Sequence, residues 1–252
     1  MIINAHSHIG DSRIFDAESS EAALLESMDT AGVDASIVMP SAGCASAAAI
    51  HDRIAELGQR YPERIYGMIQ INPHTDEEVY VAEAERCVRD LGFVGVKIHP
   101  LGYAVNPRSR DADMVFRVAR QLRIPVMIHT GSGLPWSLPA LWIPLAQKYA
   151  DVTVVLAHAG MGIFTAEAHL AAQLCPNVFL EMSWAKPPEL KWLIDDLGAH
   201  RIMMGGDLNS NLAVEVFKFR SLGLSSEELA LTLGGTANKV FKLLASQGNS
   251  QR

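Results

Sequence analysis

The sequence has few cysteines and lacks the long apolar runs of membrane proteins. Its 252 residues include three cysteines, Cys44, Cys87 and Cys175, which are far apart and form no Cys-x-x-Cys pair. An odd number of scattered cysteines indicates neither a disulfide framework nor a thiolate metal site. No segment reaches about 18 uninterrupted apolar residues, and the N-terminal residues lack the basic and apolar regions of a secretory signal. We therefore expect a cytoplasmic protein without a membrane segment.

Clustered positive charge is also missing. The 28 acidic residues outnumber the 21 Lys and Arg residues, the net charge is −7, and no run of basic residues occurs. Because a nucleic-acid backbone is bound by a concentrated cationic surface, a nucleic-acid partner is not expected. The hydrophobic fraction of 49% against 19% charged residues favours a globular protein with an extensive core. The expected partner is a small-molecule substrate.

Short apolar or β-branched runs recur eight times, and each is followed by turn residues and a stretch with helical spacing. Strands that alternate with helices pair in parallel, and eight such units allow the sheet to close. An open doubly wound sheet usually has a glycine-rich turn after its first strand, where this chain has two histidines. We therefore predict one α/β domain over residues 1–252, a (β/α)8 TIM barrel that could assemble as a homodimer. The strands are predicted at 2–5, 36–39, 65–71, 94–98, 125–128, 153–157, 178–182 and 201–204.

Helices are expected between these strands. After the eighth strand, Ser225 and Glu228 have the spacing of a capping box and predict the start of a further helix. The polar end of the chain, residues 246–252, is expected to fray. The helices between strands are predicted at 21–31, 45–61, 76–91, 111–122, 138–149, 166–174 and 188–197.

Polar side chains stand at the ends of several predicted strands. His6-Ser7-His8 ends the first strand, and side chains at i and i+2 project from one strand face, so both imidazoles can reach one ion. Three other strands end at His129, His158 and Asp207. The C-terminal ends of barrel strands converge on one mouth, so these groups can become neighbours. A hydrogen-bonded core histidine would explain any one of them but not the whole set.

Six motifs spread over essentially the whole chain carry a resemblance to a known family. With them the sequence resembles the amidohydrolase superfamily, in its amidohydrolase-related branch that includes aminocarboxymuconate-semialdehyde decarboxylase-like proteins. The motifs are specific for the superfamily and not for a substrate. They are Ile3-Asn4-Ala5-His6-Ser7-His8, Gly95-Val96-Lys97-Ile98-His99-Pro100, Pro125-Val126-Met127-Ile128-His129, Ala157-His158-Ala159-Gly160, Gly205-Gly206-Asp207 and Gly235-Thr236-Ala237-Asn238.

The resemblance implies a divalent metal, with zinc as the first expectation because imidazoles and a carboxylate are its usual catalytic ligands. Asp207 would also be catalytic, and His158 would either assist catalysis beside one ion or bind a second. The implied ligands of the first ion are His6, His8, His129 and Asp207.

Lys97 and His99 share a face of the fourth strand and are predicted to bind the substrate, as a cation or donor for a carboxylate. A buried ion pair or packing of the lysine stem is the alternative. In binuclear relatives a carboxylated lysine can bridge two ions, whereas in mononuclear relatives a lysine here faces the substrate. One ion is therefore favoured, and two remain an alternative.

The resemblance permits two reactions. The preferred one is hydrolysis of a small amide, lactone or ester by a metal-activated water, with Asp207 taking the proton and His158 stabilising the developing charge. The alternatives are a decarboxylase of a small carboxylated substrate and a non-catalytic metal-binding barrel. His51, His74, His169 and His200 are assigned no role. Candidates for specificity are Arg13, Tyr103, Arg108, Arg110, Trp136, Trp184, Lys186 and Asn209.

Overall fold

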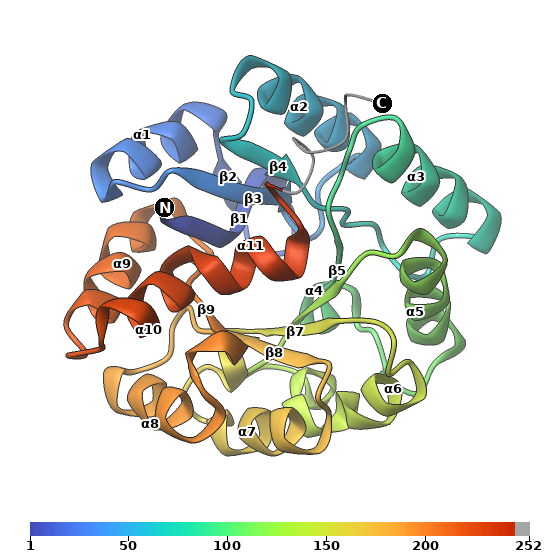
Figure 1. Ribbon diagram of the computed structural model, residues 1–252. Coiled ribbons are helices and arrows are strands. Elements are labelled where there is room, and N and C mark those ends of the chain that lie inside the picture. The colour runs from blue at the N-terminus through green and yellow to red at the C-terminus, as the bar shows by residue number, and fades with distance from the viewer. Residues whose placement is uncertain (245–252) are drawn as a thin grey trace, which may run out of the picture.

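Parallel strands form the centre of the molecule and helices surround them in a ring (Figure 1). The computed structural model describes residues 1–244. Within this part, eight parallel strands form two arcs, β1-β3-β4 and β5-β6-β7-β8-β9. Bridges from Ser7 to Asp207 and from Ile69 to Val96 join the arcs at both ends. The sheet therefore closes, and the predicted (β/α)8 TIM barrel is confirmed.

The observed strands agree with the predicted ones to within a few residues, apart from the first, because short apolar runs between turns mark buried parallel strands. The strands of the barrel are β1 (Ile3–Ser12), β3 (Ala35–Pro40), β4 (Ile65–Gly67), β5 (Val96–Ile98), β6 (Val126–His129), β7 (Val154–Ala157), β8 (Val178–Glu181) and β9 (Ile202–Met203).

Each of the helices except α10 has buried side chains. The capping box of Ser225 and Glu228 is present at the start of α10, as predicted. The helices are α1 (Glu21–Ala31), α2 (Ala47–Arg60), α3 (Glu77–Arg89), α4 (Pro100–Tyr103), α5 (Arg110–Leu122), α6 (Ile143–Lys148), α7 (Thr165–Leu174), α8 (Pro187–Leu197), α9 (Leu212–Arg220), α10 (Ser226–Ala230) and α11 (Thr236–Phe241).

Two predicted segments differ from the structure. The first strand does not stop at residue 5: β1 continues to Ser12 and pairs with the short antiparallel strand β2 (Ala17–Ser19). The segment 138–149 is not one helix, because a 3-10 turn at Pro139–Trp142 precedes α6 and Pro144 cannot donate a backbone hydrogen bond. The predicted fraying of 246–252 lies outside the described residues.

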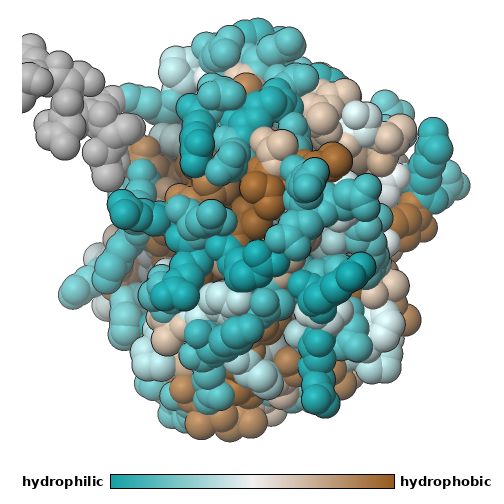
Figure 2. Space-filling model, turned by 90° about the vertical axis from the view of Figure 1, so that its right-hand side faces the viewer, coloured by the Kyte–Doolittle hydropathy of each residue, from teal (hydrophilic) through white to brown (hydrophobic). Residues whose placement is uncertain are grey.

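The core has two layers. Side chains such as Met39, Met127 and Val155 fill the inside of the barrel, while a larger apolar layer lies between the strands and the helices. Figure 2 shows one outer face, which is mainly hydrophilic with smaller apolar patches. Among residues 1–244, none of the helices has the length and apolar character needed to cross a membrane.

Candidate metal centre

His6 and His8 lie side by side on β1, with their Nε2 atoms 3.0 Å apart. The Nδ1 atom of His6 lies 2.9 Å from a carboxylate oxygen of Glu181, and Nδ1 of His8 lies 3.0 Å from the carbonyl oxygen of Pro40. Both oxygens accept hydrogen bonds, so each Nδ1 carries the proton and each Nε2 is left with a lone pair. Two lone pairs therefore face the same point.

Asp207 brings a carboxylate to these imidazoles. Its Oδ1 atom lies 3.5 Å from Nε2 of His6 and 3.4 Å from Nε2 of His8. The residue has a left-handed backbone, with φ of 61°, and its N–H donates to the carbonyl of His6 at 2.8 Å. Burial would raise the pKa of Asp207, but the neighbouring His158, His6 and His8 hold it well below its usual value. The side chain is therefore ionised at neutral pH.

The glycines before Asp207 permit this close approach. A Cβ atom at Gly205 would lie 2.5 Å from Oε1 of Glu181 and 2.9 Å from Cβ of His6. The next residue, Gly206, donates its N–H to the side chain of Asn4 at 2.8 Å, which fastens the segment to β1. A side chain at Gly205 would push apart the strands that carry the site.

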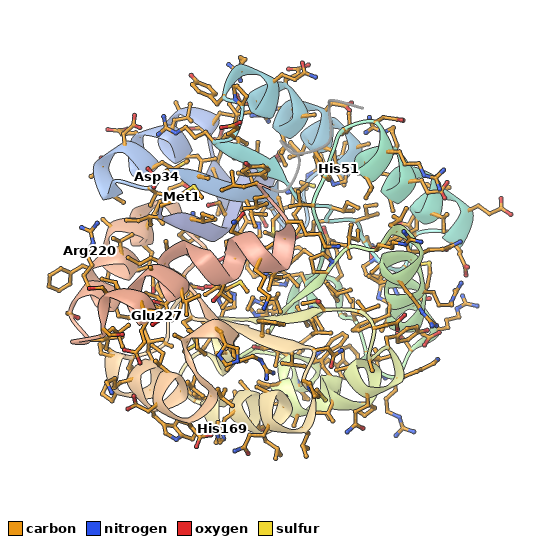
Figure 3. The ribbon with its side chains drawn as sticks, viewed as in Figure 1. Met1, Asp34, His51, His169, Arg220 and Glu227 are labelled. Carbon is orange, nitrogen blue, oxygen red and sulfur yellow. The ribbon has the colours of Figure 1, made fainter. Side chains whose placement is uncertain are left out.

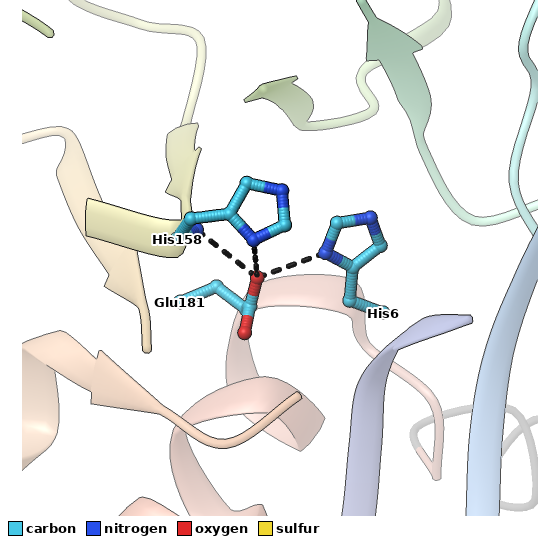
Figure 4. Close-up of side chains that lie close together, drawn as sticks. All are labelled: His6, His158 and Glu181. Carbon is cyan, nitrogen blue, oxygen red and sulfur yellow. Dashed lines mark hydrogen bonds and ion pairs between the residues drawn. The ribbon is translucent and has the colours of Figure 1, made fainter. Parts of the chain in front are cut away.

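Glu181, at the end of β8, is a site residue that the sequence analysis missed. Its carboxylate accepts from Nδ1 of His6 at 2.9 Å, from the N–H of His158 at 3.3 Å and from both the N–H and the hydroxyl of Ser183. The carboxylate lies between His6 and His158, as Figure 4 shows. The missed signal was its position, since Glu181 ends an apolar strand just as His129 and Asp207 do.

A chain of hydrogen bonds leads from Glu181 to His129. Ser183 donates to Glu181, so its oxygen accepts from Nδ1 of His158 at 2.7 Å. Nε2 of His158 then accepts from Nδ1 of His129 at 3.1 Å. This assignment leaves Nε2 of His129 as a buried lone pair, and that atom has no hydrogen-bond partner. An orphaned buried acceptor of this kind points to an absent ligand.

Burial keeps these imidazoles neutral. It lowers the pKa of His158 to about 3, although Asp207 opposes the shift. Burial likewise holds the pKa values of His6 and His129 well below the usual value, with further lowering from Lys97 and from His158 respectively. At neutral pH these rings are therefore electron-pair donors rather than cations.

Lys97 and His99 occupy different depths of the barrel. Lys97 is fully buried, its Nζ lies 2.8 Å from Nε2 of His6, and burial lowers its pKa to about 8. Lys97 does not line the pocket described below. His99 does line it, stacks on His129 with ring centroids 4.3 Å apart, and accepts the N–H of Gly102. His99 thus lies at the pocket wall, and Lys97 lies beside a histidine of the candidate metal site.

A pocket of about 710 Å³ opens over the site. Phe15, from the turn of the β1-β2 hairpin, closes one side and lies 5.7 Å from the ring of His99. Apart from histidines, the ionisable lining residues within the described part of the chain are two acids, Glu18 and Asp207, and neither lysine nor arginine is among them. The lining is His8, Ser12, Phe15, Ala17, Glu18, Ser19, Ala23, Ser41, Ala42, His99, Leu101, His129, Asp207, Leu208, Asn209 and Ser210.

The predicted specificity residues have different locations. Asn209 lines this pocket, Tyr103 lines an adjacent pocket, and Trp184 contacts Asp207. The other five line neither of these two pockets: Arg13, Arg108, Arg110, Trp136 and Lys186.

His51 provides a contrast with the site histidines. It is grouped with Glu83 and Cys87 on α2 and α3, where Figure 3 labels it. Its Nδ1 bonds to Glu83 at 2.7 Å, and its Nε2 accepts the N–H of Gln70 at 3.2 Å. No lone pair is left for a metal. At the barrel mouth, by contrast, ligand atoms of His6, His8 and Asp207 lie within 4.8 Å of one another, which fits a divalent cation, and Lys97 contacts Nε2 of His6.

Comparisons with known proteins agree with this geometry. A family model for amidohydrolases matches residues 11–243. A gamma-resorcylate decarboxylase of Polaromonas sp. strain JS666 is 27% identical over 45% of this chain, and the match spans only 44% of that protein. A gamma-resorcylate decarboxylase of Rhodococcus jostii is 24% identical over 77% of this chain and 75% of that protein. A 2-keto-4-carboxy-3-hexenedioate hydratase of Sphingobium sp. is 26% identical over 76% of this chain and 70% of that protein.

Solved structures show the same fold. An uncharacterized TIM-barrel protein of Bordetella bronchiseptica has a TM-score of 0.80 at 18% identity, covering 96% of this chain and 98% of that chain. A 5-carboxyvanillate decarboxylase of Novosphingobium aromaticivorans, solved with manganese and 4-hydroxy-3-methoxy-5-nitrobenzoic acid, has a TM-score of 0.76 at 19% identity, covering 96% of each chain.

Proposed function

The chain belongs to the amidohydrolase family, and on this premise we propose that it is a divalent-metal-dependent decarboxylase of a small aromatic acid with one carboxylate. The observation that carries the proposal is the convergence of His6, His8 and Asp207 on one point at the edge of a pocket. Three electron-pair donors there would hold an ion that faces a bound molecule.

The expectation that hydrolysis is the main reaction is wrong. The curated relatives are decarboxylases and a hydratase, and the structural neighbours with the same fold include several decarboxylases. These relatives favour the decarboxylation that the sequence analysis held as its alternative. A decarboxylase uses the same metal site but delivers a proton to carbon instead of a hydroxide to a carbonyl.

His6, His8 and Asp207 would hold one divalent ion, with the free Nε2 of His129 as a further ligand. Such an ion supplies Lewis-acid chemistry, which binds and orients a substrate carboxylate. The second group of metal-capable side chains, His6, His158 and Glu181, is already joined by hydrogen bonds. We therefore propose one ion; manganese, present in the neighbouring decarboxylase structure, and zinc are the two to test.

In the proposed reaction the bond between the ring carbon and the carboxylate breaks, its electron pair stays on the ring carbon, and carbon dioxide leaves. The ring carbon then needs a proton. Asp207 lines the pocket and is the group placed to carry that proton, which it would first take from solvent because its carboxylate is ionised. His158 is buried behind His129, so its proposed role is to orient that ring.

The charge of the pocket supports a substrate with one carboxylate. Among residues 1–244, Glu18 and Asp207 line the pocket but no lysine or arginine does, so a carboxylate beyond the one held at the ion would meet negative charge. The substrate named for the hydratase relative carries three carboxylates, and resorcylate carries one. Decarboxylation of a resorcylate-like acid thus fits this pocket better than hydration.

The test is to strip the protein with a chelator, reload it with Mn²⁺ or Zn²⁺, and assay 2,6-dihydroxybenzoate, 5-carboxyvanillate and 2-keto-4-carboxy-3-hexenedioate. We expect metal-dependent release of carbon dioxide from the first, less from the second, and no addition of water to the third. The variant His6→Ala/His8→Ala should release none. Water addition to the third substrate without carbon dioxide from either aromatic acid would overturn the proposal.

A further inference from the structure

Trp184 has a backbone conformation that an aromatic residue rarely adopts. It follows β8 in the loop before α8, and its φ is 66°. A bulky residue in the left-handed region is strained and persists only where its surroundings over-determine it. Burial does not account for the strain, because 39% of the residue is exposed. The left-handed conformation is explained by the hydrogen bonds of the backbone N–H and the indole N–H of Trp184.

The indole of Trp184 holds one oxygen of Asp207. Nε1 donates to Oδ2 of Asp207 at 2.8 Å, while Oδ1 of the same carboxylate faces Nε2 of His6 and of His8. The two oxygens therefore have separate partners. We infer that Trp184 is a positioning residue, which keeps Oδ2 away from the ion and turns Oδ1 toward it.

Buried charges on α9 fix the loop that carries Trp184. Glu215 is 2% exposed, and its Oε1 accepts the N–H of Trp184 at 2.9 Å. Lys218, paired with Glu215, donates to the carbonyls of Met182 and Ala185 at 2.8 and 2.9 Å. The pair thus anchors the backbone on both sides of Trp184. A buried ion pair often adds little net stability. We therefore interpret this pair by the backbone groups that it holds in place.

The carboxylate of Glu215 is also linked to the segment that contains Asp207. Asn211 donates through Nδ2 to Oε1 of Glu215 at 3.0 Å and to the carbonyl of Gly206 at 3.2 Å. Glu215 therefore ties the loop of Trp184 and the residue before Asp207 to one point. This arrangement fixes the indole relative to the carboxylate, which a mobile loop could not do.

The inference rests on the metal site of the proposed function but not on its reaction. Hydrogen-bond partners of metal ligands typically change metal affinity by about 10- to 100-fold when removed. We therefore expect the variant Trp184→Phe, which keeps an aromatic ring but lacks the N–H, to bind Mn²⁺ about tenfold more weakly. Its metal-free form should lose little stability relative to the metal-free wild type, because Trp184 is 39% exposed and water can replace the lost donor.

The experiment titrates Mn²⁺ into chelator-treated full-length wild type, Trp184→Phe and Trp192→Phe, and follows free Mn²⁺ by electron paramagnetic resonance. Trp192 lies on α8, is 41% exposed and contacts the ring of His169 at a centroid distance of 4.5 Å, so Trp192→Phe is a matched control whose affinity should equal that of the wild type. A second variant, Trp184→Gly, lacks the N–H and relieves the left-handed strain. It should also bind weakly, and its metal-free form should be no less stable than that of Trp184→Phe.

The outcomes separate this inference from the proposed function. If the wild type binds Mn²⁺ and Trp184→Phe binds it equally well, the positioning role is wrong while the decarboxylase proposal stands. If Trp184→Phe binds Mn²⁺ more weakly and its metal-free form also unfolds at a clearly lower temperature than the metal-free wild type, Trp184 stabilises the fold rather than positioning Asp207. In that case the inference also fails. If the wild type binds neither Mn²⁺ nor Zn²⁺, both the proposed function and the inference are overturned.

Discussion

Nε2 of His6 and Nε2 of His8 lie 3.0 Å apart, and in both rings the other nitrogen already has an acceptor. Neither Nε2 atom carries a proton that it could donate to the other, so the two lone pairs repel each other. Lys97 supplies a donor to His6 only, at 2.8 Å. A divalent ion bound by both Nε2 atoms would replace this repulsion by attraction.

A divalent ion should accordingly stabilise the fold. An ion that binds only the native state, present at 100 times its Kd, adds about 2.7 kcal/mol to the free energy of unfolding. Urea denaturation of chelator-treated protein, with and without Mn²⁺, measures this increment. The variant His6→Ala/His8→Ala should lose it. His169→Ala, on the outer helix α7, should keep it, and an equal increment in both variants would place the metal elsewhere.

Replacing Glu181 with Gln should weaken metal binding while keeping the side-chain volume. The carboxylate fixes the proton on Nδ1 of His6 and accepts from Ser183 and His158. Since the amide offers fewer acceptors to these donors, we expect metal affinity to fall about 10- to 100-fold. The metal-free protein should also lose about 1 to 3 kcal/mol of stability, because buried donors are left unpaired. Calorimetric titration with Mn²⁺ measures the affinity, and Glu228→Gln on α10 is the control that should not change it.

Much of the fold and part of the site could be predicted from the sequence. Buried parallel strands are short apolar runs, and their polar ends converge wherever a barrel closes, so His6, His8 and Asp207 were identified together. Glu181 ends β8 in the same way. It was not predicted, because a single glutamate at the end of a strand does not by itself indicate a partner of the histidines.

Other features depend on tertiary contacts that no local pattern records. The bond from Trp184 to Asp207 exists because a strained turn is held by Glu215 on a helix 31 residues further on. The strand β2 has the sequence Ala17-Glu18-Ser19, which lacks apolar alternation, and it forms because β1 continues past the barrel and offers a free edge. The pocket wall from this hairpin was therefore not predictable.

Stability at acid pH should depend on Glu83. Burial would raise its pKa, but hydrogen bonds from His51 and Arg86 outweigh that effect and lower the pKa from 4.5 to about 2. A carboxyl group with a lowered native-state pKa stabilises the fold above pH 4.5, and the contribution is lost as the pH falls from 4.5 toward 2.

Urea midpoints measured between pH 5 and pH 2.5 test this prediction. The variant Glu83→Gln should be less stable than the wild type at the upper end, and the difference should shrink toward the lower end. Glu85→Gln, on the same helix with the same change of charge, should follow the wild type, since Glu85 has only an exposed pair with Arg89. A constant gap between wild type and Glu83→Gln over the whole range would contradict the assignment.

Substrate choice should change when the charge at the pocket rim is reversed. Glu18 is an exposed lining residue on β2, and within residues 1–244 the lining contains neither lysine nor arginine. The variant Glu18→Lys would replace a repulsion of a second carboxylate of about 1 kcal/mol at 4 Å in water by an attraction of about the same size, a change of about 2 kcal/mol or roughly 30-fold in binding. We expect kcat/KM for 5-carboxyvanillate to rise by about this factor relative to 2,6-dihydroxybenzoate, mainly through KM, with Glu18→Gln intermediate. Because an exposed charge pair is screened by salt, the gain should shrink at high ionic strength. If the ratio is the same in all three proteins, Glu18 does not face the substrate, and the exclusion of a second carboxylate has another source.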